Sequence, residues 1–91
     1  MKVTIELPCA LRIFANQQPT IEIQADTVGK AFATLIEQYP DMHIHLYDYN
    51  EHFRESVVVY LDGKDVRYNH GLGTPIEEGA VISIVPIIAG G

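Results

Sequence analysis

The chain has 91 residues, of which 47% are hydrophobic, and its 12 Asp and Glu against 6 Lys and Arg give a net charge of −6. This length suits one domain, and the apolar content is typical of a packed core rather than of disorder. The negative charge disfavours nucleic acid and anionic membranes as partners, since both attract clustered Lys and Arg. No stretch reaches the roughly 20 apolar residues that a membrane span needs. The composition therefore favours one globular domain that binds a basic protein surface.

The N-terminal residues, "MKVTIELP", show neither the apolar stretch nor the small-residue cleavage site of an export signal. The single cysteine, Cys9, cannot form an internal disulfide, which agrees with a reducing compartment. We therefore expect a cytoplasmic protein.

Two segments near the N-terminus alternate between apolar and polar residues. Residues 2–7, "KVTIEL", show the period of a half-buried strand, which Pro8 ends. Residues 19–24, "PTIEIQ", repeat the pattern. The sequence thus predicts two strands that can form a hairpin.

The next segment has the period of a helix. Residues 28–39 place their apolar side chains on one helical stripe. Asp26 or Thr27 is the expected N-cap, and Pro40 stops the helix. Residues 41–55, "DMHIHLYDYNEHFRE", have no sustained period, which predicts a loop with at most one short helical turn.

The second half of the chain is rich in strand and turn signals. Residues 56–66, "SVVVYLDGKDV", combine a β-branched run with the Asp62-Gly63 pair that favours a type I′ hairpin turn. Residues 71–79, "GLGTPIEEG", are rich in turn-forming residues. A second hairpin followed by turns is therefore expected.

The last regular segment is "AVISIVP", residues 80–86. Its apolar side chains fall on both faces of a strand, with Ile82 and Ile84 on one and Val81 and Val85 on the other. This pattern predicts an interior, parallel strand.

The order of these elements predicts an α+β fold of the β-grasp type. In it, a mixed sheet of four to five strands carries one main helix across one face. We expect residues 1–86 to form this domain. Residues 87–91 would then be a flexible C-terminal diglycine tail of up to about 17 Å, at about 3.3 Å per residue.

Four motifs carry a family resemblance that covers essentially the whole chain. They are "LRIF" at 11–14, "YLDGKDVR" at 60–67, "GLGTPIEEG" at 71–79 and "IVPIIAGG" at 84–91. With them the chain resembles the ubiquitin-like sulfur carriers, which include the small subunit of molybdopterin synthase, the thiamin-biosynthesis carrier and the carrier of a cysteine-forming pathway. It is most similar to the molybdopterin and cysteine branch. Ala80 departs from the acidic residue common there, in a turn rather than in the tail.

The resemblance implies a protein cosubstrate rather than an enzyme. An ATP-dependent activating enzyme would adenylate the carboxylate of Gly91, and a sulfur donor would convert it to a thiocarboxylate. A downstream synthase or hydrolase would then accept the sulfur. Gly90 and Ala89 would let the tail pass through a narrow channel, because they have little or no side chain. ATP and the sulfur donor act through the enzyme, so no cofactor is expected to be bound.

The apolar residues at the root of the tail predict a docking surface. A domain this small cannot bury all of them, so we expect Val85, Ile87 and Ile88, together with Phe14, to border an exposed hydrophobic patch. The activating enzyme would dock there.

Other candidate sites carry weaker signals. Cys9 has no neighbouring motif that lowers a thiol pKa, so a small packed or surface thiol is expected. His43 and His45 form a His-x-His pair without the further ligands of a metal site. Three acidic residues are interpreted as a solvated loop face that could meet basic groups on an activating enzyme: Asp48, Glu51 and Glu55. No catalytic triad, phosphate loop or paired-carboxylate motif occurs, so no catalytic residue is predicted.

Two other functions fit the same sequence. A protein modifier would use the same adenylate but end in an isopeptide bond to a lysine. A purely structural subunit would insert its tail into a synthase without reacting. For a carrier, the molybdopterin, cysteine, thiamin and thioacid-siderophore pathways all remain open as destinations of the sulfur.

Overall fold

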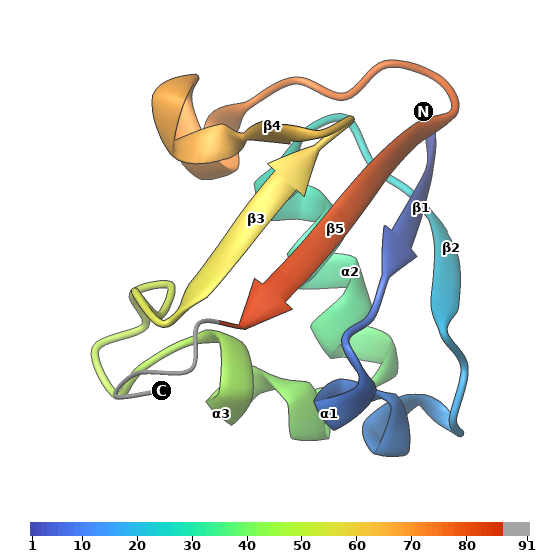
Figure 1. Ribbon diagram of the computed structural model, residues 1–91, viewed down its shortest axis with the longest axis vertical. Helices are drawn as coiled ribbons and strands as arrows, with labels where there is room; N and C mark the ends of the chain where they lie inside the picture. The colour runs from blue at the N-terminus through green and yellow to red at the C-terminus, as the bar shows by residue number, and fades with distance from the viewer. Residues whose placement is uncertain (87–91) are drawn as a thin grey trace.

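The computed structural model describes residues 1–86, which form one mixed five-stranded sheet in the order β2-β1-β5-β3-β4 (Figure 1). The strands are β1 Lys2–Glu6, β2 Thr20–Gln24, β3 Val57–Leu61, β4 Lys64–Asp65 and β5 Ala80–Pro86. The helices are α1 Cys9–Arg12, α2 Val28–Gln38 and α3 His43–Leu46. Four short 3₁₀ turns complete the described elements: η1 Ile13–Ala15, η2 Pro40–Met42, η3 Val66–Tyr68 and η4 Gly71–Gly73. The predicted β-grasp architecture is confirmed.

Strand β5 lies at the centre of the sheet, between β1 and β3 (Figure 1). It runs parallel to β1 and antiparallel to β3, where Val57 pairs with Pro86. The prediction of an interior parallel strand is therefore confirmed. The predicted first hairpin is also present, because β1 and β2 pair antiparallel over five residues each.

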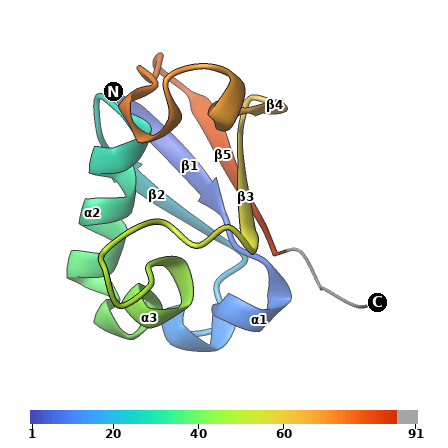
Figure 2. The ribbon, with the colours of Figure 1, turned by 90° about the vertical axis from the view of Figure 1, so that its left-hand side faces the viewer.

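Helix α2 packs across one face of the sheet (Figure 2). Its apolar stripe is buried against the strands; the buried residues are Val28, Ala31, Phe32 and Leu35. Of the two expected N-caps, Thr27 makes the capping bond, since its hydroxyl accepts the Lys30 N–H at 3.2 Å. The helix ends at Gln38, two residues before Pro40, as the restriction on the residue preceding a proline predicts.

The opposite face of β5 is only partly covered. Ala80, Ile82 and Ile84 are buried beneath α2, whereas Val81 is half-buried and Val85 is 43% exposed. No helix of residues 1–86 packs on that side of the sheet (Figure 2). Strand β5 is thus apolar on both faces for two different reasons: one face is buried in the core, and the other belongs to an accessible surface.

The segments without a clear period contain more helix than the sequence predicts. Residues 9–15 form α1 and η1, for which no element was expected. The predicted loop at 41–55 includes most of η2 and all of α3, so its helical part exceeds one short turn. Each is three or four residues long, too short for the repeat that identifies an amphipathic helix.

The second hairpin joins β3 and β4 at the predicted Asp62-Gly63 turn. Asp62 has φ 50° and Gly63 has φ 84°, so both central residues adopt the positive φ of a type I′ turn. The prediction of this turn is confirmed.

We expect Gly63→Ala to destabilise the protein by about 1 kcal/mol, because alanine in the left-handed region clashes with its own backbone. A Cβ at Gly63 meets no atom within 4 Å, so the conformation alone sets the cost. Gly73→Ala is the matched control, since its Cβ has ordinary contact with His70 at 3.9 Å and needs no positive φ. Urea denaturation measures both variants. Equal unfolding free energies would contradict the prediction.

Candidate functional site

The described chain ends where the predicted tail begins. Pro86 closes β5 at the end of the sheet where α1 and α3 lie, and it pairs with Val57 of β3 (Figure 1). The residues predicted to react, to thread and to extend the docking surface lie outside the described residues: Ile87, Ile88, Ala89, Gly90 and Gly91. The predicted tail therefore follows directly on the end of β5, the central strand of the sheet.

An apolar surface lies beside this point, on the face of the sheet opposite α2. Val85 and Val58 are direct cross-strand partners, so their side chains share that face. Val58 is 5% exposed and Val85 is 43% exposed. Tyr60 and Ser83 form the next pair on the same face. We call these four residues the open-face surface; it contains Val85, one of the predicted docking residues.

Charged groups lie next to the open-face surface. Arg67 donates to Asp65 through both Nε and Nη2, the latter at 2.7 Å. These hydrogen bonds hold the pKa of the Asp65 carboxyl below its ordinary value. On β1, Glu6 accepts the Ser83 hydroxyl at 2.6 Å. A partner that docks here therefore meets an apolar centre with fixed charges beside it.

Phe14 occupies a different position from Val85. It packs against the core from η1, and its ring lies over His45 of α3 with 4.7 Å between centroids. His45 in turn lines a hollow of about 180 Å³ that also includes Val57 and Pro86. Phe14 is thus connected to the root of the tail through His45, whereas Val85 belongs to the open-face surface. The role of Phe14 in docking stays a prediction.

The segment between α2 and β3 is held by polar contacts that the sequence did not reveal. His43 pairs with Glu51 at 2.7 Å and stacks on Tyr47 with 5.4 Å between ring centroids. Burial, with the nearby Glu51 carboxylate, raises the pKa of Tyr47. The backbone N–H groups of His52 and Asn50 bind the Asp48 carboxylate and lower its pKa. Two of the three acids interpreted as a solvated loop face therefore also stabilise the segment.

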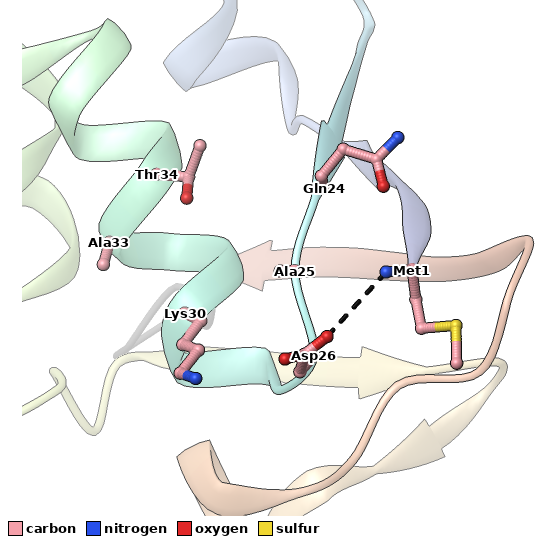
Figure 3. A pocket seen from close by; sticks show the side chains of 7 residues that line it. All are labelled: Met1, Gln24, Ala25, Asp26, Lys30, Ala33 and Thr34. Carbon is pink, nitrogen blue, oxygen red and sulfur yellow. Dashed lines mark ion pairs between the residues drawn. The ribbon is translucent and has the colours of Figure 1, made fainter.

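A larger hollow of about 350 Å³ lies between the end of β2 and helix α2 (Figure 3). Met1 and Asp26 line it, and the N-terminal ammonium pairs with the Asp26 carboxylate at 3.9 Å. Lys30, Ala33 and Thr34 face it from the helix. Both groups of the pair are more than half exposed, so this arrangement provides no desolvated acid or base.

Within 1–86, no cluster of three or more His, Cys, Asp or Glu side chains is arranged to hold a metal ion. The sequence left open whether Cys9 is packed or lies on the surface. Its thiol is exposed, so it is a surface thiol. None of the helices described is long and apolar enough to cross a membrane.

Known proteins are similar to this sequence along its length. The model of the ThiS family matches residues 5–91. The sulfur carrier protein CysO of Mycobacterium tuberculosis is 31% identical over 93 residues, which cover 100% of both chains. The same identity and coverage apply to CysO of Mycobacterium bovis.

Solved structures agree with the fold. CysO in the Amycolatopsis orientalis BexX/CysO complex superposes with a TM-score of 0.89 at 26% identity, over 98% of this chain and 99% of that chain. Mycobacterium tuberculosis CysO gives 0.87 at 28% identity, over 94% and 99%. SAMP1 of Haloferax volcanii gives 0.86 at 20% identity over the full length of both, which supports the fold alone. Sequence motifs, β-grasp topology and family match agree, and the chain belongs to the ThiS family of ubiquitin-like sulfur carriers.

Proposed function

We propose that this protein carries sulfur as a thiocarboxylate on the C-terminal carbonyl of Gly91. The observation that carries the proposal is the full-length match: the family model extends to residue 91, and relatives that align with all of the chain are named sulfur carrier proteins. The fold supports it, because β5 anchors the chain up to Pro86 in the centre of the sheet. The residues beyond Pro86 can therefore enter a partner without unfolding the domain.

The chemistry needs a partner enzyme. A carboxylate resists nucleophiles until one of its oxygens becomes part of a good leaving group. Attack of the Gly91 carboxylate on the α-phosphorus of ATP releases pyrophosphate and forms an acyl adenylate. A sulfur nucleophile then adds to the carbonyl carbon and displaces AMP; if the donor is a persulfide, a thiol must cleave the remaining sulfur–sulfur bond. The thiocarboxylate sulfur finally passes to an acceptor of the molybdopterin or cysteine type.

The open-face surface is the proposed docking site for the activating enzyme, together with Ile87 and Ile88, the apolar residues that follow Pro86 in the sequence. Val85 supports this proposal, because it is exposed, apolar and adjacent to the root of the tail. The BexX/CysO complex of Amycolatopsis orientalis supports this, because there a similar protein is bound to another protein. Phe14, whose ring packs on His45 of α3, is proposed to contribute to the same docking site.

The test is the intact mass of the protein after incubation with ATP, the cognate activating enzyme and a sulfur donor. Replacement of one oxygen by sulfur supports the carrier function. Covalent conjugates of higher mass in cells would instead identify a protein modifier, and the absence of any adenylate would identify a structural subunit. Incubated alone with ATP and sulfide, the protein is expected to remain a carboxylate. Adenylation without an enzyme would overturn the proposal.

We expect Val85→Asp to slow adenylation about tenfold or more, because a charge at the centre of an apolar interface costs at least about 1.4 kcal/mol of binding. Ile87→Asp is expected to have the same effect. For Val85→Asp the free energy of unfolding should change by only about 0.5 kcal/mol, as is usual at exposed positions. Tyr49→Asp is the control, since Tyr49 is 93% exposed on the loop after α3. Pyrophosphate exchange measures the rate; normal exchange by Val85→Asp would place the docking surface elsewhere.

A further inference from the structure

The hollow of about 180 Å³ beside Pro86 is an apolar pocket at the end of the sheet where α1 and α3 lie (Figure 1). Leu11 and Ile84 are its buried lining residues, whereas Ala10, His45 and Pro86 are exposed. Most of the lining is apolar; these residues are Pro8, Ala10, Leu11, Val57, Ile84 and Pro86. We call this hollow the tail-root pocket. It offers an apolar side chain a place that is open to solvent and backed by the core.

The pocket lies on the core side of the sheet, because Ile84, which lines it, belongs to the hydrophobic core. Successive side chains of a strand point to opposite faces, so Pro86 shares the face of Ile84, whereas Val85 faces the other way. The sequence continues with two further aliphatic residues, Ile87 and Ile88. A chain that continues in the direction of β5 places Ile87 after Val85 on the open face. It places Ile88 after Pro86, on the side of the pocket.

Ile88 can reach the tail-root pocket without any rearrangement of the domain. It follows Pro86 by two residues, so at about 3.3 Å per residue its Cα lies within about 7 Å of a residue that lines the pocket. The pocket volume of about 180 Å³ accommodates one aliphatic side chain. It is below the roughly 300–1,000 Å³ that is usual for small-molecule sites. Size and reach therefore both favour Ile88 over a separate small ligand.

A segment of the same chain also has an advantage over a side chain of another protein. A separate partner loses translational and rotational freedom when it binds. Ile88 is tethered to the wall of the pocket, so its contact is an intramolecular step with an effective concentration of about millimolar. Burial of the aliphatic side chain favours the contact, whereas the ordering of two residues opposes it. These two effects are of similar size, so the tail can still be released to a partner.

We propose that Ile88 occupies the tail-root pocket in the free protein and so holds the tail against the domain. Ala89, Gly90 and Gly91 then remain beyond the contact, with a reach of about 10 Å instead of the about 17 Å of the full tail. A partner that takes up the whole tail must first withdraw Ile88 from the pocket. This last consequence rests on the proposed function, whereas the contact itself does not.

The test is NMR spectroscopy of the full chain, without ATP or any enzyme. Nuclear Overhauser contacts are expected between the methyl groups of Ile88 and those of Leu11. The amide order parameter of Ile88 should be above about 0.6, the value below which a backbone is flexible on the ps–ns timescale. An order parameter below about 0.6, or contacts of Ile88 with Val58 or Val85 in place of Leu11, would overturn the proposal.

Ile88→Ser and Ile87→Ser form a matched pair, since they remove the same aliphatic side chain from adjacent positions of opposite facing. Ile88→Ser is expected to shift the methyl signals of Leu11 and the ring signals of His45, and to lower the order parameter at residue 88 below about 0.6. Ile87→Ser should leave the Leu11 signals and the order parameter of Ile88 unchanged. Equal effects of the two substitutions would contradict the assignment of Ile88 to the pocket.

Ala10→Met tests the contact from the domain side. The longer side chain fills the pocket from its exposed edge, so it should displace Ile88 and remove its contacts with Leu11. Ala33→Met is the control, because it adds the same side chain at an exposed position in the hollow of Figure 3 and should leave the contacts unchanged. Contacts that persist in Ala10→Met would show that Ile88 lies elsewhere. Because adenylation is not involved, failure here leaves the carrier function standing, and failure of adenylation leaves this result valid.

Discussion

Deletion of Gly91 is expected to abolish adenylation and to leave the fold intact. The shortened chain would place its carboxylate about 3.3 Å short of the nucleotide. The free energy of unfolding should change by no more than about 0.5 kcal/mol, as for substitutions that remove no buried contact. The measurement is pyrophosphate exchange with the cognate activating enzyme, run beside a melting curve. Normal exchange by the shortened chain would show that Gly91 is not the reacting residue.

Gly90→Ala is the graded companion to this deletion. The added methyl group would meet the channel walls beside the reacting carbonyl, where small misplacements cost on the order of 100-fold in rate. The chain length is unchanged, so this variant tests the effect of side-chain size separately from the effect of chain length. Slow exchange by Gly90→Ala together with none by the deletion is the expected pattern.

Phe32→Ala is expected to destabilise the domain by about 3–5 kcal/mol, a large part of the total stability of a small protein. Phe32 is fully buried on α2, and its ring lies 5.2 Å from that of Phe53, centroid to centroid. Its removal leaves a cavity between the helix and the segment before β3. Urea denaturation measures the loss.

The control for this substitution is Ile13→Ala, because Ile13 is 66% exposed on η1. It should change the free energy of unfolding by only about 0.5 kcal/mol. If both variants unfold at the same urea concentration, α2 does not anchor the core as its burial indicates.

The parts of the fold that were predicted correctly are those in which burial repeats along the sequence. Residues 2–7, 19–24 and 28–39 show periods of two or of 3.6 residues, since one face of each is buried. The Asp62-Gly63 turn was predictable for another reason: few residue pairs accept two successive positive φ angles. The interior position of β5 followed from its apolar residues on both faces.

The remaining features depend on contacts between distant residues, which no local pattern records. Helix α3 is a single turn, held by Glu51 reaching back to His43 and by Arg54 binding the Ile44 carbonyl. Strand β4 has only two residues, and Lys64 and Asp65 do not reveal in sequence that the strand ends after them. Of the candidate site, the sequence identified Val85 but not its partner Val58, because the register between β3 and β5 brings them together.

The central position of β5 also affects how the protein is made. Among the described elements it is synthesised last, yet it joins the β1–β2 hairpin to the β3–β4 hairpin. On the ribosome, both hairpins are synthesised before the strand that unites them. The contact between Val3 and Ala80 closes a loop of most of the chain, which is a slow, non-local step. A prematurely terminated product without β5 therefore lacks the strand that joins the two hairpins into one sheet. Only a chain that has been translated to the end of β5 can form the folded domain.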